Sequence, residues 1–169
     1  MRLKRKFFDR NTVVVARELI GKCLVRKVNS IFIKARIIET EAYCGQKDKA
    51  CHASRGLTPR TKIMFGPPGY AYVYMIYGMY RCLNIVTEKK GYPAAVLIRA
   101  VDMEKGKGPG RLCRELKIDK KLNGVDLVSS KELWIEEGEK IKLSQIKQGK
   151  RIGVDYAGKW KDKLWRFKI

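Results

Sequence analysis

The sequence is poor in acidic residues and in histidine. Its 17 Asp and Glu stand against 38 Lys and Arg, and His52 is the only histidine, so the formal net charge is +21. That excess is far larger than solubility requires, and it favours a polyanion as binding partner. Nucleic acid is the commonest such partner. An anionic membrane surface, or an ion-rich surface without a special role, is the alternative.

The sequence also lacks paired cysteines and long apolar runs. The odd number of cysteines and the absence of any Cys-x-x-Cys pair argue against a disulfide framework and against a zinc or iron–sulfur site. No stretch approaches the ~18 apolar residues of a membrane span, and no signal-peptide core follows the start. We therefore expect a soluble intracellular protein in a reducing compartment, with no metal and no membrane partner. The cysteines are Cys23, Cys44, Cys51, Cys82 and Cys113.

Aromatic residues make up only 9% of the chain, yet they are concentrated in one place. Five tyrosines fall within eleven positions of the stretch YAYVYMIYGMYRCLNI, residues 70–85. Basic residues lie mostly elsewhere, with eleven in residues 1–36 and six in residues 37–88. The 169 residues, 45% of them apolar, suffice for the core of a single domain spanning 1–169.

The hydrophobic pattern predicts two helices, several strands and a long loop. NTVVVARELIG, residues 11–21, has an N-cap asparagine, an apolar stripe at helical spacing and a final glycine. Pro109 after a glycine suits a second helix start, whose amides could also meet a phosphate. Residues 44–70, rich in glycine, proline and polar residues, indicate a loop. An antiparallel meander is the simplest arrangement of the central strands. Strands are expected at 22–28, 30–43, 70–76, 79–88, 92–103 and 163–169.

The tyrosine cluster has two explanations that periodicity cannot separate. Tyr70, Tyr72 and Tyr74 would share one face of a strand, where they could form an aromatic ladder in the core. Phenol rings also stack on unpaired bases, with a contribution of ~1–3 kcal/mol per base.

Specific motifs favour the second explanation. ETEAYCG, CHASRG, TPRTKIMFGPPGYAYVYMIYGMYRCLNIV and AVLIRAV stand in this order, and RIGVDYAGKW follows near the end. Together they resemble the alkyladenine (3-methyladenine) DNA glycosylase family, roughly from Arg17 to Leu116 and again at the C-terminal motif. The resemblance implies an α/β fold of the α+β type. It would be a single domain with a curved antiparallel sheet flanked by helices and a protruding β-hairpin that inserts into DNA.

The resemblance also implies the activity. Such an enzyme flips a damaged purine out of double-stranded DNA and hydrolyses its N-glycosidic bond without a cofactor. Glu41 matches the carboxylate that activates the water, Arg99 matches a side chain that positions it, and the backbone carbonyl of Ile152 matches a further water ligand. The chemistry is consistent, because a carboxylate can deprotonate the water and stabilise the oxocarbenium-like sugar.

By the same resemblance, the flipped base is contacted by Tyr43, His52 and Tyr74. Asn84 and Leu97 would line its minor-groove edge, and Asn84 would exclude the 2-amino group of guanine.

The turn between the two tyrosine-rich strands matches the part that enters the DNA. Tyr77 matches the residue that intercalates in place of the extruded nucleotide, and Met79 matches a neighbour that contacts the opposite strand. Tyr72 and Tyr80 are expected only to pack.

Two rival functions remain open from the residues. A glycosylase with lyase activity would attack the sugar through a lysine amine. A noncatalytic module could bind distorted DNA or structured RNA through the same basic surface and tyrosines. The preferred lesion among alkylated purines, hypoxanthine and etheno adducts is also open, and we expect a monomer.

Overall fold

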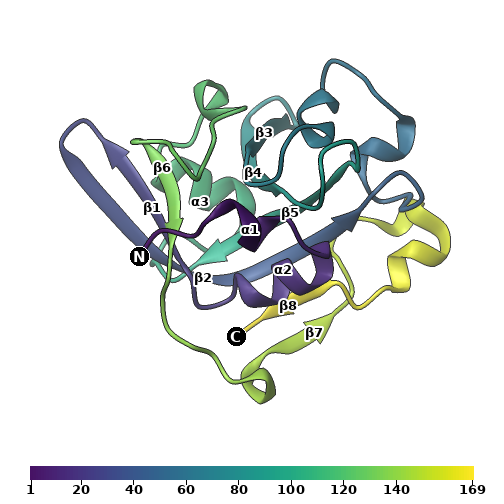
Figure 1. Ribbon diagram of the computed structural model, residues 1–169. Coiled ribbons are helices and arrows are strands. Elements are labelled where there is room, and N and C mark those ends of the chain that lie inside the picture. Colours follow the sequence, from purple (N-terminus) through teal and green to yellow (C-terminus); the bar gives the residue numbers. More distant parts are fainter.

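The computed structural model describes residues 1–169, with strands, short α-helices and short 3₁₀ helices (Figure 1). None of the helices has the length and apolar character needed to cross a membrane. The strands are β1 (Cys23–Val28), β2 (Ile31–Cys44), β3 (Ala71–Ile76), β4 (Tyr80–Val86), β5 (Ala94–Val101), β6 (Leu133–Glu136), β7 (Lys147–Gly149) and β8 (Arg166–Lys168). The helices are α1 (Arg5–Phe8), α2 (Thr12–Glu18), η1 (His52–Arg55), η2 (Lys62–Phe65), α3 (Pro109–Glu115), η3 (Lys120–Leu122), η4 (Leu143–Gln145) and η5 (Asp155–Asp162).

The eight strands form one antiparallel sheet. Its order is β3-β4-β5-β2-β1-β6, and β8 joins β7 to β2. Strands β3, β4 and β5 form the predicted meander. The register of the long strand β2 against β5 shifts between Ile37 and Thr40, and such irregularities bend a strand. The prediction of an α+β fold with a curved antiparallel sheet flanked by helices is confirmed.

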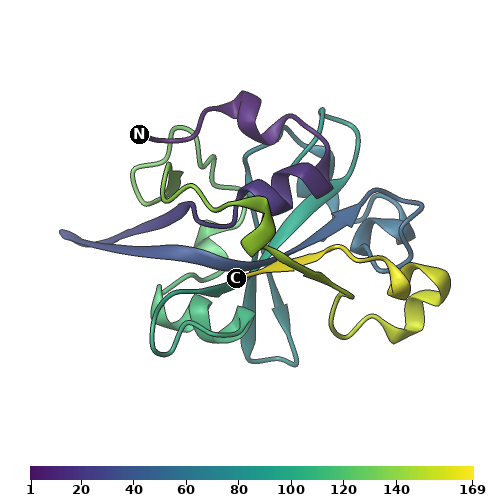
Figure 2. The ribbon, with the colours of Figure 1, turned by 90° about the horizontal axis from the view of Figure 1, so that it is seen from below.

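Helices cover both faces of this sheet (Figure 2). Helix α2 lies with α1 on one face and begins, as predicted, after Asn11, whose side chain accepts hydrogen bonds from two backbone N–H groups. It buries Val15 and Ala16 in a core cluster of 26 residues. Helix α3 starts at Pro109, as predicted, and lies on the other face beside β4 and β5.

The segment from 44 to 70 is more ordered than its composition indicates. It contains η1 and η2, and it buries Cys51, Ala53 and Met64 against Tyr72 in a second apolar cluster. The prediction of a loop without packed elements is therefore wrong for this part of the chain. Short 3₁₀ turns with one or two apolar anchors leave little periodic signal in a sequence.

The β3–β4 hairpin projects from the face opposite to α1 and α2 (Figure 2). At its tip Tyr77 and Gly78 both have positive φ, 51° and 67°, and the Met79 N–H donates to the Ile76 carbonyl at 3.2 Å. Such a turn matches the twist of the strands that it joins. It leaves the Tyr77 side chain almost free of contacts, with 86% of the residue exposed.

Candidate active site

A cavity of about 320 Å³ lies at the base of the β3–β4 hairpin. Its wall is formed by β2, β3, β4 and β5, by Tyr77 at the hairpin tip, by the segment 50–64, by Pro109 at the start of α3 and by residues 152–156. Most of these side chains are apolar or aromatic, with a few polar groups among them, as in sites that enclose a small molecule. The cavity brings together segments that are far apart in the sequence.

Glu41 is a fully buried carboxylate that does not itself line the cavity but contacts three residues that do, Tyr43, Arg99 and Ile152. Its Oε1 accepts a hydrogen bond from the backbone N–H of Ile152 at 2.8 Å, and its Oε2 accepts one from the Tyr43 hydroxyl at 2.8 Å. Burial raises the pKa of Glu41, although Arg99 and the Ile152 N–H act in the opposite direction. Each carboxylate oxygen has a second lone pair, so the group retains the capacity to accept a further hydrogen bond.

Arg99 lies between two carboxylates. Its Nη1 is 3.4 Å from Glu41 Oε1, and its Nε is 3.4 Å from Glu39 Oε1. Glu39 also pairs with Arg166 at 3.0 Å. Arg99 therefore lines the cavity with carboxylates on both sides of its guanidinium, next to Glu41 as the motifs predict.

An aromatic group forms another wall. The ring centroids of His52 and Tyr74 are 4.6 Å apart in an edge-to-face arrangement, and those of Tyr72 and Tyr74 are 5.2 Å apart. His52 Nδ1 is 3.0 Å from the Tyr72 hydroxyl. Burial and the charges of Arg60 and Arg55 lower the pKa of His52 to about 4. The imidazole is therefore neutral at pH 7.

The structure brings most of the predicted site residues to this cavity. Tyr43, His52, Tyr74, Asn84 and Leu97 all line it. Asn84 and Leu97 lie opposite each other on β4 and β5, and the Asn84 Nδ2 donates to the Tyr72 carbonyl at 3.3 Å.

The remaining predicted residues are placed at the rim or beyond it. Tyr77 reaches the cavity from the hairpin tip, whereas Met79 is 70% exposed and does not line it. Ile152 lines the cavity, and its contact with Glu41 uses the backbone N–H. The role predicted for the Ile152 carbonyl stays a prediction.

Two tyrosines of the cavity were not predicted. Tyr72, expected only to pack, contributes its ring to the wall and its hydroxyl to the contact with His52. Tyr72 and Tyr74 are two positions apart on β3 and so share one face of the strand, which is the sequence signal that places Tyr72 at the same wall. Tyr156, 71% exposed, stands at the cavity in η5. Tyr80, in contrast, packs as expected: its ring lies so close to Gly110 that a Cβ there would meet it at 2.8 Å.

A buried ion pair behind the wall was also missed. The two guanidinium nitrogens Nη1 and Nη2 of Arg151 bind the two carboxylate oxygens of Asp48 at 2.6 and 2.9 Å, and both side chains are fully buried. Arg151 also donates to the carbonyls of Ala42 and Trp160. The motif RIGVDYAGKW contains Arg151, but nothing in the sequence pattern indicates a partner 103 residues away.

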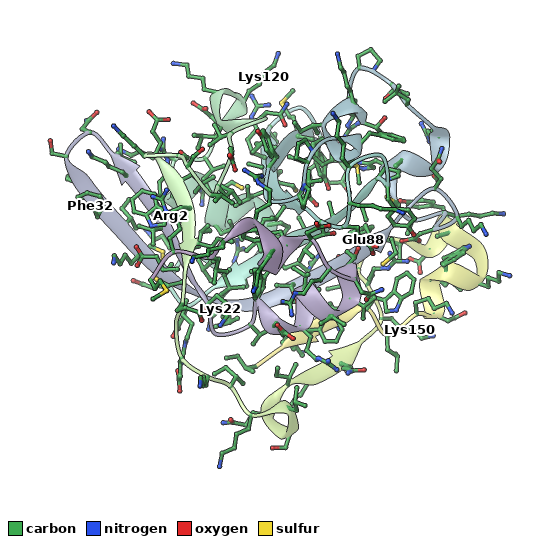
Figure 3. All side chains as sticks on the ribbon, viewed as in Figure 1. Arg2, Lys22, Phe32, Glu88, Lys120 and Lys150 are labelled. Atoms are coloured by element: carbon green, nitrogen blue, oxygen red, sulfur yellow. The ribbon has the colours of Figure 1, made fainter.

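Basic side chains come from several separate parts of the fold. Lys22, Lys120 and Lys150, for example, lie in different parts of the molecule (Figure 3). Such a distribution gives long-range attraction to a polyanion without marking one face. The position of the cavity and of the hairpin, rather than charge alone, must therefore indicate where a ligand binds.

Comparisons with known proteins agree with this geometry. Residues 6–169 match the family described as methylpurine-DNA glycosylase (MPG). A protein of Methanocella arvoryzae is 51% identical over 183 residues, covering 98% of this chain and 90% of its own. One from Legionella pneumophila (strain Corby) is 50% identical over 173 residues, covering 99% and 94%. One from Desulfitobacterium hafniense (strain Y51) is 45% identical over 192 residues, covering 98% and 94%. All three bear the provisional name 3-methyladenine DNA glycosylase. The chain therefore belongs to the methylpurine-DNA glycosylase family, a family of DNA-repair hydrolases that act on damaged bases.

Proposed function

We propose that this glycosylase flips a damaged purine nucleotide of duplex DNA into the cavity and hydrolyses its N-glycosidic bond with a water activated by Glu41. The observation that carries the proposal is the state of Glu41. It is the buried carboxylate beside the cavity, held by two hydrogen bonds and by Arg99. Its pKa is raised, and a general base becomes stronger as its pKa approaches the working pH.

The reaction needs a base and an electrostatic partner at one place. When the purine departs, the sugar develops oxocarbenium-like positive charge, and a neighbouring carboxylate stabilises that charge. The same carboxylate accepts a proton from the water that attacks the anomeric carbon. Arg99, at 3.4 Å, favours the ionised form of Glu41, against the effect of burial, and restrains its position. The Ile152 carbonyl would orient the water from the other side.

The aromatic wall would hold the extruded base. Tyr74 offers a ring face, while Tyr43 and the neutral His52 complete the enclosure. The Tyr43 hydroxyl donates a hydrogen bond to Glu41. Burial raises the pKa of Tyr43 well above its usual value, so the hydroxyl stays protonated. Asn84 would face the minor-groove edge of the purine. Alkylated purines, hypoxanthine and etheno adducts would thus be admitted by shape and stacking.

The hairpin would replace the base in the helix. Tyr77 stands at the tip of a projecting turn, exposed, and also reaches the cavity. A ring in this position can fill the gap in the base stack while the nucleotide occupies the cavity. Met79, exposed next to it, would meet the opposite strand.

The rival functions fit the cavity less well. A lyase mechanism requires an amine nucleophile at the reacting sugar, and none of the residues that line the cavity is a lysine. A binding module has no use for a buried carboxylate, which is costly to hold in a charged state.

A base-release assay tests the proposal. Duplexes that each carry one lesion, namely 3-methyladenine, 7-methylguanine, hypoxanthine or 1,N⁶-ethenoadenine, are incubated with the protein, and undamaged duplex is the control. Release of at least one modified purine, with strand scission only after alkaline treatment, is expected. Borohydride trapping of a covalent complex would identify a lyase instead. Tight lesion binding with no release from any duplex would identify a binding module.

A further inference from the structure

Two arginines beside the cavity have no acidic partner. Arg55 ends η1 and Arg60 precedes η2, and neither takes part in any ion pair of the structure. The guanidinium carbon of Arg60 lies 4.9 Å from the centroid of the Tyr74 ring. Tyr74 lines the cavity, whereas Arg60 is exposed and does not line it, so Arg60 meets this ring from the solvent side.

The pKa of His52 shows the effect of these two charges inside the cavity. Its ring lines the cavity 4.6 Å from that of Tyr74. After burial, the charges of Arg60 and Arg55 are the causes that lower its pKa. The two arginines therefore disfavour a positive charge on the imidazole of His52. A cationic ligand bound next to His52 would be repelled by the same two arginines.

The remaining charged groups at the cavity do not cancel this effect. Arg99 pairs with Glu41 and with Glu39, and Glu39 also pairs with Arg166, so these carboxylates are already engaged by other arginines. Arg151 is neutralised by Asp48 behind the wall. The positive charge contributed by Arg55 and Arg60 thus remains uncompensated on the aromatic side.

We propose that Arg60, assisted by Arg55, makes the cavity discriminate between damaged bases by charge, so that cationic purines are disfavoured relative to neutral ones. This inference rests on the proposed function, because it assumes that a purine stacks on Tyr74. A nucleoside alkylated at purine N3 or N7 carries a positive charge, whereas hypoxanthine and ethenoadenine nucleosides are neutral.

The physical reason is competition for one ring. The face of an aromatic ring attracts a cation, and Arg60 already uses the Tyr74 ring in this way. A cationic base on the inner face would lie roughly 8 Å from the guanidinium, given an ordinary stacking distance. With an effective dielectric constant between that of a protein surface and that of water, this repulsion would lower the rate or the affinity for a cationic base by about fivefold.

The test compares two lesions in one sequence context. Single-turnover excision of 7-methylguanine and of hypoxanthine is measured for the parent and for Arg60→Gln, Arg60→Lys and Lys62→Gln. Arg60→Lys keeps the charge, and Lys62→Gln removes an exposed charge from the same segment. We expect the ratio of the 7-methylguanine rate to the hypoxanthine rate to rise about fivefold in Arg60→Gln and to stay within twofold in the two controls.

Two outcomes would overturn the inference. An unchanged ratio in Arg60→Gln would show that the charge does not reach the bound base. A fall of both rates by the same factor would show that Arg60 contacts a DNA phosphate, which serves all lesions equally.

A second readout does not depend on activity. Because His52 is the only histidine, its imidazole resonances can be assigned without ambiguity in an NMR titration. The His52 pKa should rise from about 4 towards its usual 6.5 in Arg60→Gln and remain unchanged in Lys62→Gln. The same pKa in Arg60→Gln and the parent contradicts the inference. Release of none of the four lesions of the base-release assay by the parent would refute the proposed function instead, and with it this inference.

Discussion

The backbone N–H of Ile152 lies 2.8 Å from Glu41 Oε1, although 111 residues separate the two in the sequence. The neighbouring residue Arg151 explains how this contact is held. Its side chain binds Asp48, in the turn that follows β2, and the carbonyl of Ala42, next to Glu41 in β2. The C-terminal segment is thereby fastened to the strand that carries the carboxylate.

Asp48→Asn should strongly destabilise the fold. The substitution leaves the buried guanidinium of Arg151 without its counter-charge, and breaking such a pair costs about 3–5 kcal/mol of unfolding free energy. Asp162→Asn is the matched control, because its pair with Lys150 is exposed and screened by water, so its loss should change stability little. Urea denaturation measures both. Losses of similar size in the two variants would contradict the role assigned to the buried pair.

Tyr77→Ala should weaken lesion binding by about tenfold while binding to undamaged duplex changes little. The variant loses the ring that would fill the gap in the stack, but it keeps the basic surface. Met75→Ala is the control, because Met75 is exposed on β3 and does not line the cavity. Equilibrium binding to paired lesion and plain duplexes gives the comparison. Equal losses on both duplexes in Tyr77→Ala would exclude a wedge role.

Asn84→Ser should admit guanine-like bases. The Asn84 amide is buried and fixed through its bond to the Tyr72 carbonyl, so it would meet the 2-amino group of guanine as a clash or as an unpaired polar contact. The shorter side chain should raise excision of guanine from mismatches relative to hypoxanthine by roughly tenfold. Asn11→Ser, at a distant helix cap where serine is accepted, should not change this ratio. If Asn84→Ser also leaves the ratio of guanine to hypoxanthine excision unchanged, a residue other than Asn84 excludes guanine.

Much of this arrangement was predictable from local patterns, and the reasons for the exceptions are physical. Helix α2, its Asn11 cap and the β3–β4–β5 meander follow from periodicity and turn residues, which act over a few positions. The cavity residues followed from motifs. The pairing of Arg151 with Asp48 is a long-range contact without a periodic signal. The cavity role of Tyr72 is not predictable from its sequence position alone, because a ring that packs and a ring that lines a cavity show the same alternation along a strand.

The pKa of Glu41 predicts how its contribution to stability depends on pH. Because burial raises this pKa above the unfolded value of 4.5, the neutral carboxyl is favoured in the fold. The contribution is complete below the unfolded pKa and is lost as the pH rises through the folded pKa. Glu41→Gln, which resembles the neutral form, should therefore melt above the parent at pH 7, and the difference should shrink towards pH 5. A difference in Tm that does not vary with pH would contradict the raised pKa.

The central claim, that Glu41 activates the attacking water, is tested most directly by single-turnover base release in Glu41→Gln. The amide keeps the shape and can still accept the Ile152 hydrogen bond, but it cannot accept a proton from water. Glu39→Gln removes the other carboxylate beside Arg99 and is the control. We predict that Glu41→Gln lowers the rate of release by about 10²-fold or more, with lesion-DNA affinity nearly unchanged, while Glu39→Gln retains most of the activity. A rate in Glu41→Gln close to that of the parent would contradict the account.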